Sequence, residues 1–513
     1  MAEPTKRRFK AISMIFTALT GLGSVSYGYS AFVLSSTLAE PSFYHYMKLE
    51  GRPDANDLIG LTGSLFQAGG CLGSLLVSFF ADRWGRRVGI AFPAALSVFS
   101  AALLAGSVNI GMFIVFRFFA GAASCMIVSA VTLWISEVVP PNVRGSFVNV
   151  NGASILLGGV MAAWVGYGFS HLRPGDVDSK QWRAPLALGT LPALILLCCL
   201  YWLPESPRWL ISQGRHDEAK RVLSRLESPE EAASEFLQIH AQIQHDANLE
   251  SSYISMVTKP SYRKRTILAV LTTFSTQLTG PLVIVNYGAL IYAQLGFDTN
   301  KQIIYQGGWI MVGLAGGLIS LFIVDLVSRP ALIAGGILGS LAMLAIEAAL
   351  VATYATTPES LANPNQSALQ AAVAIFYVYI LIFEATLEGV QFVYLGEIFP
   401  THLRAKGIGI GISALCLINI MYLQVAPMAF AHVGWKFYLA FIVPGTFMAF
   451  VILFFWPNTR QMPLEDIAAL FGDEFEHVDE ARYPQEVLSV HDAEVKYAEK
   501  ERPAEKLTPS GQD

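Results

Sequence analysis

The sequence predicts an all-α membrane protein with about twelve transmembrane helices in two six-helix bundles. Of its 513 residues, 53% are hydrophobic and only 14% are charged, whereas a soluble chain normally carries about a quarter charged residues. Stretches such as 58–80, 184–203 and 437–456 hold no charged residue, and each is long enough for the roughly 20 residues of a membrane span. In addition, a charged motif recurs at the same place in the two halves of the chain.

Hydrophobic runs separated by polar breaks predict six spans in each half. They lie near 11–36, 58–80, 89–108, 110–135, 146–170 and 184–204, and then near 264–294, 305–326, 331–354, 369–396, 403–428 and 434–457. We therefore expect five parts of the chain. They are a cytosolic N-terminus (1–10), an N-terminal six-helix bundle (11–204), a cytosolic helical linker (205–263), a C-terminal six-helix bundle (264–457) and a cytosolic tail (458–513).

Basic residues are concentrated in every second loop. They precede the first span and follow the second, fourth and sixth, whereas the loops between carry acids such as Glu50 and Asp54. By the positive-inside rule both termini are cytosolic, which an even number of spans also requires. Asn365 begins an Asn-Gln-Ser glycosylation sequon and then falls on the outer side. We expect a multi-pass protein of the plasma membrane.

The charged motif has the same spacing in both halves. Glu137 is followed by Pro140 and Arg144, and Glu397 is followed by Pro400 and Arg404. Each copy lies at the inner end of the fourth span of its half. Two six-span halves with matching charges on the inner face are typical of transporters built from parallel repeats.

Three runs carry a resemblance to a known family. Gly73–Arg87, Pro204–Leu210 and Glu397–Gly407 resemble the sugar porter branch of the major facilitator superfamily, and the resemblance extends over residues 20–472. It implies the major facilitator fold and transport by alternating access between the two bundles. Asn458 departs from the closing motif of that branch, which usually has Glu at this position.

The charges near the inner ends of the helices have a mechanical interpretation. Ion pairs among them would form when the helix ends are close and break when they separate, which would bias a two-state equilibrium without touching the substrate. The alternative is that they only set topology and solubility. The residues concerned are Asp82, Arg83, Arg86, Arg87, Glu137, Arg144, Glu205, Arg208, Asp325, Arg329, Glu397 and Arg404.

Arg117 lies within an apolar span, where a charge costs at least about 2.5–3.5 kcal/mol. We therefore expect it to face a cavity or a partner, although it could also snorkel or bond backbone carbonyls. In proton-coupled sugar porters the matching arginine has an aspartate partner in the first span, and that position is Ser30 here. The missing acid favours facilitated diffusion over proton coupling.

Three acids, Glu347, Glu384 and Glu388, also lie within the predicted spans. Glu384 matches a glutamate of many sugar porters, which implies a role in helix packing or gating. Glu388 stands where that family usually has Gly. It could bind a proton or a polar group of the substrate, or it could hydrogen-bond a neighbouring helix.

A sugar site needs amide and hydroxyl groups for the substrate hydroxyls and an aromatic face for the ring. The resemblance assigns Gln277, Tyr287 and Asn419 to such positions. Losing other polar groups weakens binding of a hexose, since each unmatched hydroxyl costs free energy to bury. We therefore expect a larger, more apolar pocket that fits a modified sugar or a less polar metabolite as well as glucose. The departures from the family are Gly152 and Thr276 for Gln, Leu282 for Asn and Phe392 for Trp.

These features predict a secondary transporter of a sugar or sugar-like small organic solute, facilitative in preference to proton-coupled. An exporter of a less polar or secondary metabolite and a non-transporting nutrient sensor are the alternatives. The sequence has no phosphate-binding loop and no catalytic constellation, so we expect no enzyme activity, cofactor or metal. The five cysteines fall in apolar runs and are interpreted as packing residues. We expect a monomer whose partners are a small-molecule solute and the bilayer, without nucleic acid.

Overall fold

The computed structural model describes residues 11–460, except 139–140, 172–178, 227–228, 247–251, 325 and 356–364, together with a few positions between 462 and 472. This part of the chain is almost entirely helical and contains no strand. Ten of its helical stretches are long and apolar enough to cross a membrane. The longest, His402–Phe455, contains two helices, and α1 (Ala11–Ala39) is a further long helix without charged residues. The predicted all-α membrane fold is confirmed.

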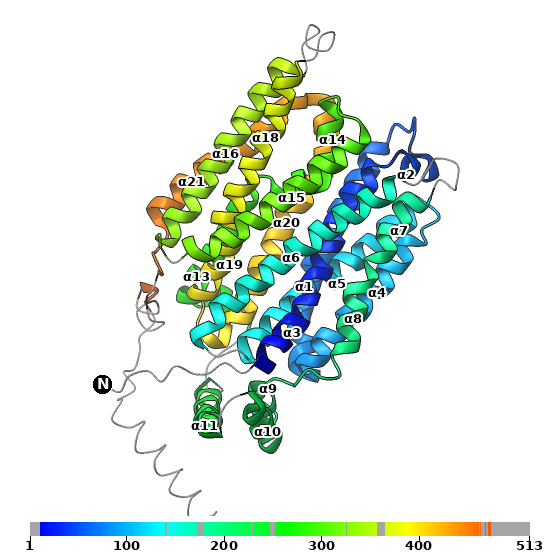
Figure 1. Ribbon diagram of the computed structural model, residues 1–513. Coiled ribbons are helices and arrows are strands. Elements are labelled where there is room, and N and C mark those ends of the chain that lie inside the picture. The colour runs from blue at the N-terminus through cyan, green and yellow to red at the C-terminus, as the bar shows by residue number, and fades with distance from the viewer. Residues whose placement is uncertain are drawn as a thin grey trace, which may run out of the picture.

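The first half of the bundle lies on one side of the molecule (Figure 1). Its helices extend past the hydrophobic runs, because a helix continues into the polar interface while the run marks only the hydrocarbon core. The sixth span is divided at Gly189 into two helices. After α1 the elements are α2 (Pro41–Tyr46), α3 (Ala55–Trp84), α4 (Arg86–Ala105), α5 (Ile110–Val138), α6 (Pro141–Ser170), α7 (Lys180–Leu188) and α8 (Thr190–Cys199).

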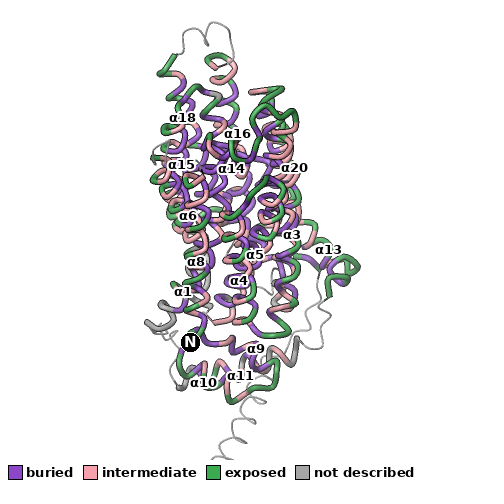
Figure 2. Tube along the Cα trace, turned by 90° about the vertical axis from the view of Figure 1, so that its right-hand side faces the viewer, coloured by how far each residue is buried: buried purple, intermediate pink, exposed green. Residues whose placement is uncertain are grey.

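Four short helices connect the halves. They are α9 (Pro207–Ser212), α10 (His216–Leu226), α11 (Pro229–Asp246) and α12 (Ser255–Thr258). The first three share a small hydrophobic cluster that includes Leu210, Leu223 and Phe236. Both views show α9 to α11 beneath one end of the bundle (Figures 1 and 2). We call this end the linker side and the opposite end, where α2 lies, the far side.

The second half repeats the six spans. Its helices are α13 (Pro260–Gln277), α14 (Pro281–Gln294), α15 (Thr299–Ile323), α16 (Arg329–Tyr354), α18 (Gln366–Phe383), the π-helix η1 (Glu384–Glu388), α19 (Gly389–Ile398), α20 (Thr401–Val433), the 3₁₀-helix η2 (Gly434–Tyr438) and α21 (Leu439–Phe455). The seventh span breaks at Gly280, whose φ of 78° favours glycine, and Pro281 then starts α14. The tenth span is interrupted by η1.

Glycines allow the helices of the first half to touch backbone to backbone. A Cβ added at Gly121 of α5 would lie 1.8 Å from the Phe66 carbonyl oxygen of α3. A Cβ added at Gly158 of α6 would lie 2.2 Å from the Val25 carbonyl oxygen of α1. Close approach through small residues is a general means of packing helices in a membrane, and here it makes the first half a compact unit.

The two halves meet along three pairs of helices, α1 with α14, α3 with α20 and α6 with α15. On the far side the Ser64 hydroxyl of α3 donates to Gln424 Oε1 of α20 at 2.7 Å. Nearer the linker side, Ser74 of α3 and Ser413 of α20 bond through their hydroxyls at 3.0 Å. The boundary between the halves is therefore built by helices from both.

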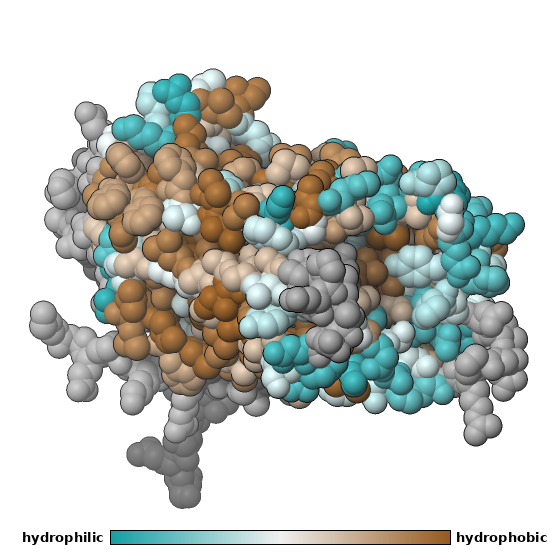
Figure 3. Space-filling model, turned by 90° about the horizontal axis from the view of Figure 1, so that it is seen from above, coloured by the Kyte–Doolittle hydropathy of each residue, from teal (hydrophilic) through white to brown (hydrophobic). Residues whose placement is uncertain are grey.

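Large apolar side chains cover the flank of the second half. On α21, Phe447, Phe454 and Phe455 are 68%, 75% and 75% exposed. Seen from above, hydrophobic residues dominate one side of the molecule, and hydrophilic residues gather over the side where α2 lies (Figure 3). Exposed apolar flanks of this size fit a surface that faces lipid.

Candidate functional site

Two amide side chains assigned to the substrate site meet in the second half. Gln277 is the last residue of α13, just before the break in the seventh span, and Asn419 lies in α20. Asn419 Nδ2 donates to Gln277 Oε1 at 3.2 Å, and both residues are buried. Each amide has further donors and acceptors, so the pair retains the capacity to bind hydroxyl groups.

A second polar chain runs beside this pair. The Thr276 hydroxyl donates to Gln391 Oε1 at 2.5 Å, and Gln391 Nε2 donates to Glu388 Oε2 at 2.9 Å. Thr276 and Gln391 are fully buried, whereas Glu388 is only partly so. Glu384, in contrast to Glu388, is buried, and its side chain packs against Gly313 and Gly316 of α15. Its contacts are those of a packing residue.

The other positions assigned to substrate binding are distributed around the boundary. The Tyr287 hydroxyl donates to the Leu423 carbonyl at 2.9 Å and would lie 3.0 Å from a Cβ added at Gly63 of the first half. Gly152 is exposed, and a Cβ there would meet nothing within 4 Å. Phe392 is partly buried. Its position is next to an apolar cluster formed by residues of both halves.

That cluster, which we call the thiol cluster, lies between α3 and α5 of the first half and α19 and α20 of the second. Its buried members are Cys125, Leu415 and Cys416. Four partly buried residues pack against it, which are Tyr27, Cys71, Phe392 and Ile412. The cysteines are free thiols, and they pack as small apolar residues, as expected. The cluster gives the boundary an apolar wall beside the polar chain.

Arg117 is 1% exposed and lies inside the first half. Its Nε donates to the Thr62 carbonyl at 3.1 Å, and its Nη1 donates to the Ser30 carbonyl at 2.9 Å. The guanidinium also lies 4.3 Å from the centre of the Phe66 ring. Arg117 therefore bonds backbone carbonyls, one of the alternatives to a charged partner. The backbone of Ser30 thus occupies the place of an acidic partner.

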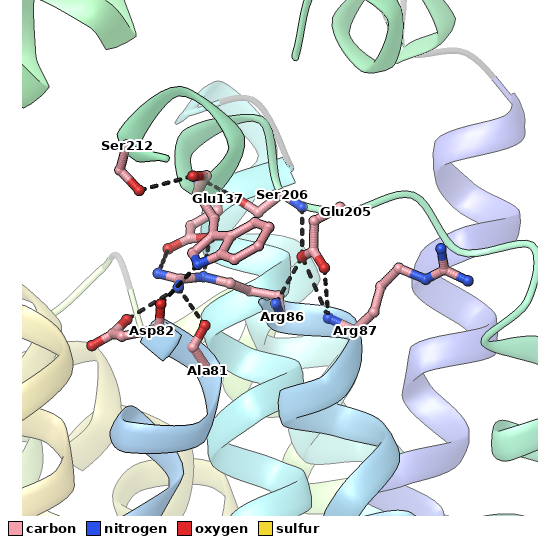
Figure 4. Close-up of polar contacts among 9 residues, drawn as sticks. Ala81, Asp82, Arg86, Arg87, Glu137, Glu205, Ser206 and Ser212 are labelled. Atoms are coloured by element: carbon pink, nitrogen blue, oxygen red, sulfur yellow. Dashed lines mark hydrogen bonds and ion pairs between the residues drawn. The ribbon is translucent and has the colours of Figure 1, made fainter. Parts of the chain in front are cut away.

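Three predicted inner-face acids of the first half, Asp82, Glu137 and Glu205, bond Arg86 at the linker side (Figure 4). Arg86 forms a bidentate pair with Glu137, with N–O distances of 2.7 and 2.8 Å. Its Nη1 also bonds Asp82 Oδ1 at 3.0 Å. Glu205 accepts from the backbone N–H groups of Arg86 at 2.7 Å and of Arg87 at 3.2 Å. The cluster ties the ends of α3, α4 and α5 to the start of the linker.

The second half repeats this arrangement around Arg329. Arg329 Nη2 lies 2.8 Å from Glu397 Oε1, and the Thr459 hydroxyl donates to Glu397 Oε2 at 2.5 Å. The Arg329 N–H donates to Asn458 Oδ1 at 3.4 Å. Asn458 therefore caps the N-terminus of α16, as Glu205 caps the N-terminus of α4. In both clusters the described pairs join helices of one half.

The remaining predicted residues have few described contacts or lie outside the described part of the chain. Arg83 is exposed, with its guanidinium 5.8 Å from the centre of the Trp84 ring. Arg208 lies in α9 and Arg404 in α20. The side chain of Arg144 and all of Asp325 lie outside the described residues, as do 1–10 and the tail beyond 472. Asn365 is exposed and its side chain caps α18 by accepting from the Ala368 N–H at 3.2 Å.

Gln391 and Tyr27 are among the boundary residues that were not singled out from the sequence. Gln391 links Thr276 to Glu388, and Tyr27 packs on the thiol cluster. A glutamine three residues after a glutamate in an apolar span is a detectable signal, since such a pair shares a helix face. Tyr27 carries no comparable signal, because tyrosine is common in membrane helices.

Two matching bundles with polar side chains at their boundary define a solute carrier of the major facilitator class. The chain belongs to the sugar (and other) transporter family, whose sequence model matches residues 16–471. The expected family is confirmed, and it is a family of transporters and not of enzymes.

Relatives and solved structures agree over most of the chain. The MFS-type transporter criB of Aspergillus cristatus is 29% identical over 461 residues, covering 89% of this chain and 92% of the relative. The sugar transporter STL1 of Saccharomyces cerevisiae is 26% identical over 91% of this chain and 82% of its own length. The partially occluded inward open xylose transporter XylE from E. coli matches with a TM-score of 0.76 at 22% identity, covering 88% of this chain and 100% of that one. That likeness confirms the fold.

Proposed function

We propose that the chain is a secondary transporter that moves a sugar or sugar-like small organic solute by alternating access between its two halves. The observation that carries the proposal is the hydrogen-bonded pair of Gln277 and Asn419, two amides at sugar-site positions of the family. Sugar and polyol hydroxyls are donors and acceptors at once, and amides match both roles. The names of STL1 and XylE point to the same substrate class.

Movement of each half as a unit follows from the packing. The clusters around Arg86 and Arg329 join helices within a half, and glycine contacts such as Gly121 on Phe66 leave little room for sliding. Between the halves, α3 and α20 also pack closely, as at Gly60 beside the Gln424 carbonyl oxygen, and they share the Ser74–Ser413 hydrogen bond. Rocking of two rigid bundles about a central site is the motion that such an arrangement favours.

The proposal includes facilitated diffusion in preference to proton coupling. Arg117 is bonded by the carbonyls of Ser30 and Thr62 and stacked near Phe66. It therefore needs no carboxylate partner that gains and loses a proton. We further propose a monomer in the plasma membrane, with cytosolic termini and with Asn365 available for glycosylation because it is exposed.

An exporter of a less polar metabolite is the second candidate. The apolar thiol cluster beside Phe392 favours it. So does the open space at Gly152, where the family has an amide. Both features reduce the number of polar groups offered to a fully hydroxylated sugar.

Uptake of radiolabelled hexoses, pentoses and polyols into cells without their own sugar carriers tests the proposal. We expect saturable uptake of at least one solute, unchanged by a proton uncoupler. Asn419→Ala should weaken its apparent affinity about tenfold, because a hydrogen bond to a substrate hydroxyl is lost. Gly335→Ala is the matched control, since a Cβ there meets nothing within 4 Å. No uptake of any sugar or polyol would contradict the substrate class, and loss of uptake with the uncoupler would contradict facilitated diffusion.

A further inference from the structure

We propose that the boundary between the halves binds its solute through a positively charged amine, with the Glu388 carboxylate as the counter-ion. The inference rests on the proposed function, since it assumes that the solute passes through this boundary. It specifies the substrate class further: a sugar-like or small organic solute that carries an ammonium group.

Glu388 is held in place by its own half. It is the last residue of η1, and its Oε2 accepts from Gln391 Nε2, whose carbonyl accepts from Thr276. Glu388 is the last acceptor in this chain of hydrogen bonds, a role that a carboxylate fills. Gln391 and Thr276 are fully buried, so they fix the position of the acid. The Thr276 hydroxyl donates its hydrogen within this chain, so that hydrogen is not available to a sugar.

The acid has no positive partner among the described residues. Its described hydrogen bond comes from the Gln391 amide, and the other acid of η1, Glu384, lies one turn before it. Among the ion pairs of the described residues, none joins a lysine, arginine or histidine to Glu388. Arg117, which is buried in the first half, bonds backbone carbonyls instead. Charged side chains inside a membrane normally pair with one another or line a pathway. A solute ammonium would provide the missing charge.

The surroundings of Glu388 suit an organic cation. Phe392 lies one helical turn after it, and Tyr27 belongs to α1 of the first half. Both rings pack against the thiol cluster. Aromatic faces attract ammonium groups, and this attraction strengthens when water is removed. A carboxylate, two aromatic rings and an apolar wall from both halves thus lie together.

Binding and counterflow measurements with matched pairs of solutes test this inference in proteoliposomes. The first pair is D-glucose and D-glucosamine, and the second is 2-phenylethanol and 2-phenylethylamine. In each pair a hydroxyl is replaced by an ammonium group. We expect the amine of at least one pair to bind about tenfold more tightly, which corresponds to one charged hydrogen bond. Glu388→Gln should reduce that preference to about twofold or less.

Glu347→Gln is the matched control, because it neutralises another buried acid of the same half and should leave the preference unchanged. Equal binding of amine and alcohol in both pairs would overturn the inference, as would a preference that survives in Glu388→Gln. Loss of transport of both members in Glu388→Gln, with the amine preference kept, would assign the acid to a proton and overturn it too. Amine binding that depends on Glu388 without transport would instead contradict only the proposed function.

Discussion

At the scale of single residues, Arg117 shows how a charge is accommodated inside a membrane bundle without an opposite charge. Two carbonyls and one ring surround the guanidinium, and its planar fork of donors matches this arrangement better than an ammonium would. The sequence indicated that Arg117 needs a partner and that the usual acid is absent. It could not indicate which carbonyls take over, because they belong to α1 and α3.

Replacing Arg117 should reduce stability measurably. Arg117→Ala loses two charge-assisted hydrogen bonds, each contributing about 1.5–3 kcal/mol, and Arg117→Lys keeps a charge but cannot reach both carbonyls while lying flat near Phe66. We expect both variants to melt at a lower temperature in detergent. Arg52→Ala is the control, because Arg52 forms an exposed pair with Asp54, and such pairs contribute little. Equal melting temperatures for Arg117→Ala and Arg52→Ala would refute this account.

At the scale of elements, each half caps the N-terminus of one helix with a side chain that follows its last span. Glu205 follows the sixth span and caps α4, whereas Asn458 follows the twelfth and caps α16. The distances are 2.7 Å for the carboxylate and 3.4 Å for the amide. A negative charge at a helix N-terminus adds about 0.3–1 kcal/mol through the helix dipole. The cap of α16 is therefore the weaker of the two.

Restoring a carboxylate at this cap should strengthen the second half. We expect Asn458→Glu to raise the melting temperature and Asn458→Ala to lower it, with changes in unfolding free energy of about 0.5–1 kcal/mol. Glu205→Gln should be destabilising, because the amide still accepts hydrogen bonds but loses the charge. Thermal unfolding of the three variants measures these effects. A melting temperature that falls in Asn458→Glu would show that the neighbouring Glu397 repels the new charge.

At the scale of the whole molecule, the far side is closed by contacts between halves. Gly60 of α3 allows the closest of these, since a Cβ there would lie 2.5 Å from the Gln424 carbonyl oxygen of α20. Gln424 also bonds Ser64 and the Asp57 carbonyl of the first half. Gln424 of α20 thus contacts three residues of α3. Small changes at these contacts should alter the equilibrium between the conformations with the far side closed and open.

Enlarging Gly60 should separate the halves on the far side. In Gly60→Ala the new Cβ would collide with the Gln424 carbonyl oxygen and push α3 and α20 apart. We therefore expect a cysteine introduced by Ser64→Cys to react faster with a membrane-impermeant maleimide in intact cells when Gly60→Ala is also present. Uptake by Gly60→Ala should fall. Labelling above that of the five native cysteines measures the effect. Gly335→Ala, with open space around it, should change neither quantity. Unchanged labelling in Gly60→Ala would mean that this contact does not hold the far side closed.

Sequence alone predicted the membrane class and the two six-span halves, and the resemblance assigned Gln277, Asn419 and Arg117 to positions of the family. Span length, hydrophobicity and repeated motifs are local properties, and they can be read without knowing the packing. The partners of these side chains follow only from the packed helices. Arg117 bonds backbone carbonyls, Arg86 and Arg329 bond acids of their own halves, and Glu388 bonds Gln391 beside the thiol cluster. These residues come from spans far apart in the chain, and only the packing of the helices brings their side chains within hydrogen-bonding distance.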